Sequence, residues 1–292
     1  DLSNFADVFP VPNVQLGDMA DKGYINPVAT KFANEIKKDN SDVTVNGVTY
    51  KDKIYAFPKS TESLVLFYNK SKLSADDVKT WEGMTAKAGF AANYTDPYYS
   101  YPVFFTAGTT LFGKSGEDVK STDVASANGV KALEWIAAQK SNKNVIQTTN
   151  ALNQLQAGKV AAMFDGPWDT ANIKKILGDN FAVAPYPTIN IDGQAKQLQS
   201  FQGIKGFAVN SASKSQAAAQ TVAQYLSSES AQLKLFNSQG DVPTNNDAQM
   251  NDAVKNSDVT KAVITMSKEG NSVVMPKLPQ MATFWNNAGP LM

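Results

Sequence analysis

The stretch "KVAAMFDGPWDTAN" (Lys159–Asn172) joins an apolar run, an Asp-Gly-Pro turn and a tryptophan. The apolar run Lys159–Phe164 predicts a buried strand, and the Asp-Gly pair that follows predicts a turn. Pro167 suits the first position of a helix, because the N–H that proline lacks has no helical partner there. Trp168 is therefore expected where a strand ends and a helix begins, which is where open α/β sheets bind ligands.

Strand and helix signals alternate along much of the chain. Short β-rich runs at Lys53–Pro58, Ser63–Asn69 and Lys205–Asn210 predict strands. Apolar residues at helical spacing predict helices over Asn128–Asn142 and Thr149–Gly158. This alternation is typical of α/β architecture with mostly parallel sheets. No low-complexity linker separates two halves, so we expect two interleaved domains with a chain that crosses between them more than once.

The composition excludes several classes of function. With 292 residues the chain is long enough for two domains, and 27 basic residues balance 27 acidic ones. A net charge of zero argues against nucleic acid or an anionic membrane as a partner. The sequence has no Arg, His or Cys, which removes the guanidinium fork, the commonest general base, and thiol chemistry. We therefore expect no metal and no cofactor, and no phosphate-binding loop is present.

The two ends of the sequence read as the interior of a domain. The opening "DLSNFADVFPVP" shows no signal peptide, and the closing "NNAGPLM" stops without a capped final element. No apolar run reaches the 18 residues that suggest a membrane span. We expect further residues of the protein at both ends.

Aromatic residues are the first candidates for ligand contact. The segment "YTDPYYSYP" (Tyr94–Pro102) holds four tyrosines, and its prolines argue against a regular helix or a central strand. A sugar ring can stack on such aromatic faces while its hydroxyls bond to polar groups, but the residues alone favour an aromatic loop packed on the domain surface. Trp285 follows two prolines and reads either as a stacking surface or as a buried anchor. Trp81 and Trp135 are interpreted as packing residues.

Two carboxylates lie near these aromatic segments. Glu62 precedes an apolar strand, and Asp96 lies within the tyrosine-rich segment. A pair of carboxylates can hydrolyse a glycoside, one as acid and the other as base or nucleophile. The same groups can instead accept hydrogen bonds from sugar hydroxyls, or simply be solvated.

Three segments together resemble a known family. They are "IYAFPKSTESLVLFYNKSKL" (Ile54–Leu73), "AGKVAAMFDGPW" (Ala157–Trp168) and "MPKLPQMATFW" (Met275–Trp285). In this order they resemble the solute-binding proteins of ABC sugar importers, in particular the maltose/maltodextrin-binding branch. The resemblance implies an α/β, two-lobed periplasmic-binding-protein-like fold with three hinge crossings and sugar bound between the lobes.

The resemblance also implies how the chain divides. The first lobe is expected to contain residues 1–64 and 206–275, without its amino-terminal part, and the second lobe residues 65–205 and 276–292, without its carboxy-terminal part. The hinge crossings are expected near Thr61–Leu66, Phe201–Gly206 and Val274–Pro279.

The family pattern assigns roles to individual positions. The residues that the resemblance places at the sugar are Glu62, Asp96, Tyr98, Tyr99, Trp168 and Trp285. Trp168 and Trp285 are the expected platforms under the sugar rings, with Tyr98 as a third stacking surface. Glu62 is expected to accept sugar hydroxyls, and Asp96 stands where the family has a longer Glu.

The predicted function is therefore the extracellular sugar-binding component of an ABC importer, with no catalytic residues. It is expected to bind maltose or maltodextrin, to close its lobes around the sugar, and to deliver it to the transmembrane subunits of a permease. The resemblance further implies a monomer anchored at the cell surface as a Gram-positive lipoprotein. The alternatives are a secreted glycosidase using Glu62 and Asp96, or the same fold binding a different oligosaccharide.

Overall fold

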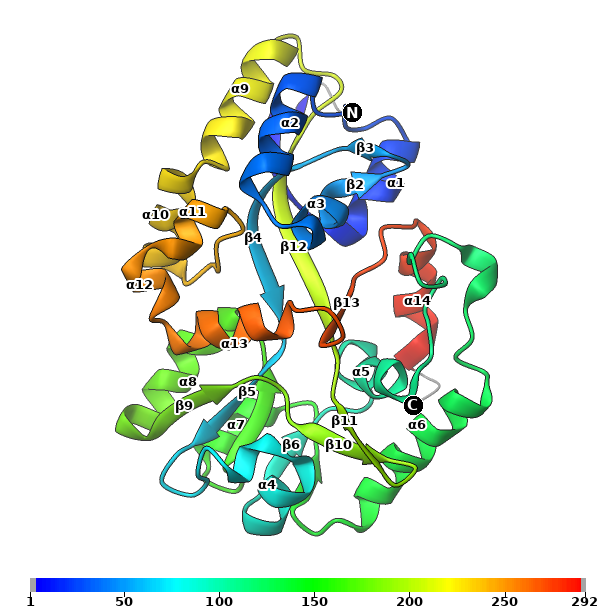
Figure 1. The fold of residues 1–292 in the computed structure, drawn as a ribbon, viewed down its shortest axis with the longest axis vertical. Helices are drawn as coiled ribbons and strands as arrows, with labels where there is room; N and C mark the ends of the chain where they lie inside the picture. The colour runs from blue at the N-terminus through cyan, green and yellow to red at the C-terminus, as the bar shows by residue number, and fades with distance from the viewer. Residues whose placement is uncertain (1–3, 290–292) are drawn as a thin grey trace. The chain divides into compact units, whose positions relative to one another are not determined.

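The computed structural model describes residues 4–289, which form two compact units (Figure 1). Among these residues, unit 1 comprises 4–62, 202–257 and 274–281, and unit 2 comprises 63–201, 258–273 and 282–289. The outermost residues of the two predicted lobes, 1–3 and 290–292, lie outside the described part.

This division departs from the predicted one in two long segments, and residues 63–64 and 202–205 at the other boundaries also change sides. Residues 258–273 were expected in the first lobe but belong to unit 2, and residues 276–281 were expected in the second lobe but belong to unit 1. Helix α13 (Asp258–Met266) causes the first difference, because it packs on strands β5 (Val65–Asn69) and β9 (Phe181–Ala184) of unit 2. The chain consequently changes unit after residues 62, 201, 257, 273 and 281, at five points rather than three.

Unit 1 is built around two long strands, β4 (Phe57–Ser63) and β12 (Ser200–Val209), which pair with each other and extend to the border of unit 2. β1 (Val8–Pro12) adds antiparallel to β12, and β13 (Ser272–Val274) also pairs with β12. The remaining elements are η2 (Asn13–Gln15), α1 (Leu16–Asp21), α2 (Thr30–Asp39), α3 (Asp42–Val48), β2 (Thr49–Tyr50), β3 (Lys53–Ile54), α9 (Gln216–Leu226), α10 (Glu229–Gln239), α11 (Asn246–Met250) and α12 (Asp252–Lys255).

Alternating apolar residues on the strands supply the core of unit 1. Val11, Phe57 and Ile204 are almost fully buried, each on a different strand of the sheet. Helices α2 and α9 lie side by side in Figure 1, and the Ala29 backbone N–H donates to Gln220 Oε1 at 2.7 Å.

A late segment of the chain is fixed to unit 1 by buried polar groups. Lys277 is 2% exposed, and its ammonium donates to the backbone oxygen of Asn46 at 2.9 Å. Buried Asn13 donates to Met275 O and accepts from Ile204 N. A buried polar group is costly unless it is hydrogen-bonded, so these contacts specify the position of residues 274–281.

Unit 2 is a five-stranded sheet in the order β7-β6-β8-β5-β9 with helices around it. Its strands are β5 (Val65–Asn69), β6 (Phe90–Ala92), β7 (Val145–Gln147), β8 (Ala162–Asp165) and β9 (Phe181–Ala184), with the hairpin β10 (Thr188–Ile191) and β11 (Gln194–Gln197). Its helices are η3 (Asp77–Lys79), α4 (Trp81–Lys87), α5 (Pro97–Ala107), η4 (Val119–Ser121), α6 (Ala127–Ala138), η5 (Gln139–Ser141), α7 (Ala151–Gln156), η6 (Pro167–Asp169), α8 (Thr170–Leu177), η7 (Gly178–Asn180), α13 and α14 (Gln280–Ala288), whose first two residues belong to unit 1.

The expectation of mostly parallel sheets is wrong. In unit 2, β6 is parallel to β7 and β8, whereas β5 is antiparallel to both β8 and β9. Parallel neighbours require a crossover, and α5, α6 and α7 supply the crossovers between β6, β7 and β8. The α/β character is confirmed, but as mixed sheets.

Trp81 and Trp135 pack in the core of unit 2, as predicted. Both are at least 91% buried, their rings meet edge to face at 5.2 Å, and the Trp81 indole N–H donates to Gln139 Oε1 at 2.9 Å. Phe90 extends the cluster at 4.8 Å from Trp81. Aromatic pairs in this geometry stabilise a core beyond the area that they bury.

Gly17 tests how tightly α1 is fitted against residues 274–281. Its N–H donates to Lys277 O at 3.1 Å, and a Cβ at this position would lie 2.0 Å from that oxygen. Gly17→Ala should lower the free energy of unfolding by roughly 1–3 kcal/mol, the usual cost of overpacking. Urea denaturation measures it, with Asp18→Ala as the exposed neighbour for control. Equal midpoints for the two variants would contradict the close fit.

Candidate functional site

Four aromatic side chains from distant parts of the sequence meet in unit 2. Tyr98 is at the centre: its ring lies parallel to Phe201 (5.8 Å between centroids, 1° between planes). Trp285 lies 6.3 Å and Trp168 lies 6.5 Å from the Tyr98 ring. Phe201 is fully buried, Tyr98 and Trp285 are partly exposed, and Trp168 is 46% exposed. The three predicted stacking residues therefore form one partly exposed aromatic platform on a buried phenylalanine.

The tyrosine-rich segment is a helix, contrary to the predicted loop. Asp96 caps α5 by accepting from the Tyr98 N–H at 2.9 Å, and Pro97 occupies the first helical position, where proline is tolerated. Pro102 lies inside the helix and removes one hydrogen bond, a cost that the burial of nearly all the following residues offsets. The carboxylate predicted to contact sugar is thus engaged in holding the helix that presents Tyr98.

Trp168 occupies the predicted position between strand β8 and helix α8. Pro167 opens the 3₁₀ helix η6, which continues into α8. The Trp168 ring folds back over Gly166, where a Cβ would lie 2.2 Å from the ring carbons. Glycine at this turn is therefore a steric requirement of the platform.

Asp165 is a buried carboxyl at the end of β8. Its Oδ1 accepts from the Gly166 N–H at 2.7 Å, and only 6% of the residue is exposed. Burial raises the pKa of Asp165 from 3.8 to about 7; the Gly166 and Trp168 hydrogen bonds oppose the rise, and the nearby Asp169 carboxyl adds to it. The Asp165 carboxyl therefore contacts the backbone of the turn at Gly166, the Trp168 side chain of the platform and the carboxyl of Asp169.

Tyr99 lies beside the platform and contacts Tyr98. Its ring meets Tyr98 edge to face at 5.8 Å, and it lines a pocket of about 190 Å³ with Asp165 and Asp169. Burial raises the pKa of Tyr99 well above its usual range, and the neighbouring carboxylates add to the effect. At neutral pH this phenol is a neutral hydrogen-bonding group beside the stacking surface.

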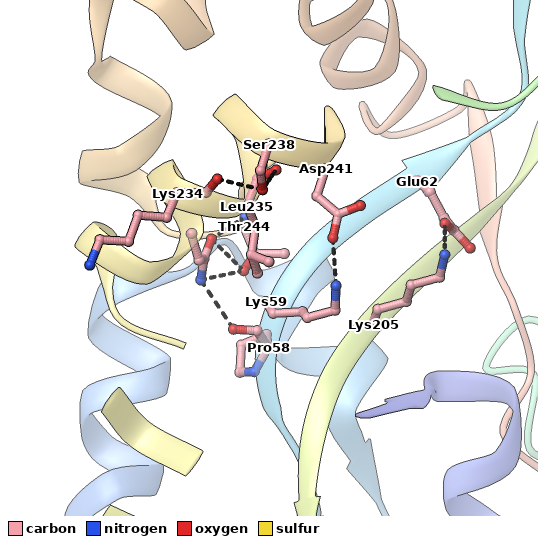
Figure 2. A network of polar contacts seen from close by, with 10 residues as sticks. Pro58, Lys59, Glu62, Lys205, Lys234, Leu235, Ser238, Asp241 and Thr244 are labelled. Carbon is pink, nitrogen blue, oxygen red and sulfur yellow. Dashed lines mark hydrogen bonds and ion pairs between the residues drawn. The ribbon is translucent and has the colours of Figure 1, made fainter. Parts of the chain in front are cut away.

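Glu62 belongs to unit 1, whereas the platform residues belong to unit 2. Its Oε2 forms an ion pair with Lys205 at 2.6 Å, as Figure 2 shows. Gly203 leaves room for it, because a Cβ there would lie 2.9 Å from Glu62 Cγ. Figure 2 also shows the pair of Lys59 and Asp241 farther along the same strand. Glu62 is 19% exposed at its side chain and presents carboxylate and ammonium together.

The sequence reasoning missed Phe201 and Asp165. Phe201 reads as an ordinary core residue of an apolar strand, and nothing local shows that it supports Tyr98. Asp165 was assigned only to a turn, although its position directly after a buried strand is a signal for a group at the carboxyl edge of the sheet.

Within residues 4–289, no group of three or more acidic side chains is arranged to hold a metal ion. The helices of that part are also too short or too polar to cross a membrane.

Comparison with known proteins places this chain in a family. The model of the bacterial extracellular solute-binding proteins matches residues 3–262. The chain belongs to this family. An unliganded maltodextrin-binding protein of L. casei, MalE1, superimposes with a TM-score of 0.97 at 54% identity, covering 100% of this chain and 79% of that one.

Curated relatives of the family are more distant. The maltooligosaccharide ABC transporter solute-binding lipoprotein of Streptococcus pneumoniae is 29% identical over 98% of this chain and 70% of its own length. The galactooligosaccharide-binding protein of Bacillus subtilis is 26% identical over 97% of this chain and 70% of its own length. These similarities establish the two-lobed solute-binding fold.

Gly166→Ala should displace the Trp168 ring, because the added methyl group occupies its place. The tryptophan emission should change in the same direction as in Trp168→Phe, while far-UV circular dichroism stays that of the wild type. Lys175→Ala, exposed on α8, is the control. An emission spectrum identical to the wild type would show that the ring does not depend on Gly166.

Asp165 should make stability fall as the pH rises. Its folded pKa of about 7 exceeds the usual 3.8, so between these values the folded state holds a proton that the unfolded state has lost. The contribution of Asp165 to stability is therefore fully present below about pH 4, decreases from about pH 4 to pH 7, and is lost above. Urea midpoints at pH 5 and 8 should show a smaller decrease for Asp165→Asn than for the wild type or exposed Asp179→Asn. Equal decreases in all three proteins would exclude this contribution.

Proposed function

We propose that the chain binds an oligosaccharide of α-linked glucose, such as maltose or a maltodextrin. The convergence of Tyr98, Trp168 and Trp285 carries this proposal. Sugar rings present C–H groups on their faces and hydroxyls at their edges, so partly exposed aromatic rings hold the faces while polar groups read the edges. A buried phenylalanine behind Tyr98 keeps that ring from turning away from a ligand.

Relatives support the same ligand class and a transport role. The L. casei protein is described as maltodextrin-binding, and the S. pneumoniae relative as a lipoprotein of a maltooligosaccharide ABC transporter. We accordingly assign this chain to the outside of the cell, anchored through a lipidated segment, where it delivers sugar to a membrane permease. That it acts as a monomer, and that lobe closure accompanies binding, stay predictions.

We propose no hydrolytic role for the carboxylates. Asp96 caps a helix and Glu62 is held by Lys205, so each has a structural partner. Asp165 and Asp169 are close enough to share a hydrogen bond, whereas a retaining glycosidase separates its two carboxyls by about 5–5.5 Å. Glu62 paired with Lys205 is instead suited to a sugar hydroxyl, which can donate to the carboxylate and accept from the ammonium.

A second candidate ligand is a galactose-containing oligosaccharide. The B. subtilis relative with that description is 26% identical to this chain, as is the maltodextrin-binding protein of the same organism, whereas the L. casei maltodextrin-binding protein is 54% identical. Stacking reads the face of a ring but discriminates poorly between linkages. A galactooligosaccharide is therefore titrated alongside maltotriose.

Titration with maltotriose should give saturable binding that depends on the platform. Trp168→Ala and Trp285→Ala should each weaken binding roughly tenfold, because each loses one stacking face. Leu133→Ala, exposed on α6 of the same unit, should leave the affinity unchanged. Calorimetry measures the affinities, and chromatography of the recovered ligand should show intact maltotriose.

The results of this titration distinguish a glucan-binding protein from a galactooligosaccharide-binding protein and from a glycosidase. Binding of the galactooligosaccharide alone would replace the glucan with the second candidate. Shortened products would support the glycosidase. Full affinity in both tryptophan variants would remove the platform from the site.

A further inference from the structure

The pocket beside the platform differs chemically from the platform itself. It opens at the carboxyl ends of the parallel strands β6 and β8, where Asn93 follows β6 and Asp165 is the last residue of β8. The start of α7 and the residues before it form the opposite wall, with Thr148 and Asn150 among them. Its volume of about 190 Å³ far exceeds the about 10–15 Å³ that one water needs, so a group of several heavy atoms fits.

The two carboxyl groups of this pocket have no basic side chain beside them among its described lining residues. Asp165 and Asp169 both line it, none of its described lining residues is a lysine, and neither carboxyl is in an ion pair within residues 4–289. The titratable groups that face Asp165 are Asp169 on η6, Tyr99 on α5 and Tyr186 after β9, and all are acids. No neighbouring cation therefore stabilises the ionised form of Asp165.

A second observation also indicates a missing ligand. Tyr94 lines the same pocket and is 7% exposed, yet its hydroxyl has no hydrogen-bond partner. Burial raises the pKa of Tyr94 far above its usual range, so this group stays a neutral donor and acceptor. Buried hydroxyls are almost always bonded, and exceptions occur where a ligand or an ordered water belongs.

We infer that this pocket receives a protonated amine carried by a sugar whose rings stack on the platform, so that the protein prefers amino-substituted oligosaccharides to neutral ones. The inference rests on the proposed function, because the platform supplies the rest of the binding. An ammonium donates hydrogen bonds to both carboxylates at once and compensates their charge, which a neutral hydroxyl does not. The remaining hydroxyls of the same residue can reach Asn93, Thr148 and Asn150.

Binding of the amine should release a proton. Below pH 7 the carboxyl of Asp165 is largely protonated. A ligand that arrives as an ammonium keeps its own proton and favours the ionised carboxylate, so the carboxyl proton passes to the buffer. Maltotriose carries no charge and should release much less.

The test compares maltotriose with two derivatives in which the 6-hydroxyl of the reducing or the non-reducing terminal residue is replaced by a primary ammonium. Calorimetry at pH 6.5, in two buffers of different ionisation enthalpy, gives both the affinity and the protons released. At least one derivative should bind roughly tenfold tighter than maltotriose, the usual strength of a hydrogen bond to a charged group. It should also release protons.

The variants are judged by the ratio of the derivative's affinity to that of maltotriose, so that any effect on the platform cancels. Asp165→Asn and Asp169→Asn should each reduce this ratio toward one and remove most of the proton release. Asp179→Asn, an exposed carboxylate of the same unit, should keep both.

Two outcomes overturn the inference while the proposed function stands: both derivatives bind no tighter than maltotriose, or the preference survives in both variants. If maltotriose and the derivatives all fail to bind, the proposed function fails and the inference fails with it.

Discussion

The parallel stack of Tyr98 on Phe201 is the contact on which the candidate site depends. Phe201 is fully buried at the start of β12, whereas Tyr98 is on the first turn of α5. A ring held flat against a buried ring has one face left for contact, and Trp168 and Trp285 lie 6.5 and 6.3 Å from the Tyr98 ring. The platform is therefore assembled by long-range packing, and each contributing segment supplies only one ring.

Local chemistry in the sequence predicted the turn that carries Trp168. Pro167 at a first helical position and glycine before it are short-range signals, and the structure follows them. The same kind of local signal is present in the tyrosine-rich segment, where the predicted loop is in fact helix α5. The two prolines of the tyrosine-rich segment predict no helix, yet Asp96 followed by Pro97 is itself a helix-start signal. The tertiary burial of α5 outweighs the one hydrogen bond that Pro102 removes.

Features that depend on contacts between distant residues could not be predicted from the sequence. Helix α13 joins unit 2 because it packs on β5 and β9, and no signal near residue 258 shows that partner. Likewise Phe201 has no local feature that distinguishes support of a stacking tyrosine from ordinary core packing. The family resemblance identified the residues of the platform, but their mutual geometry and the role of Asp96 as a cap came only from the structure.

Asp165 connects the platform with the acidic pocket. Its carboxyl contacts the turn at Gly166 and the side chain of Trp168, and it shares a hydrogen bond with Asp169 across the pocket wall. Ionisation of this carboxyl strengthens the hydrogen bonds that it accepts from the turn and from the indole. A cation in the pocket would favour ionisation and thereby hold Trp168 more firmly. By reciprocity, a ring stacked on a firmly held Trp168 would favour the cation, so the two halves of the site are coupled through one buried proton.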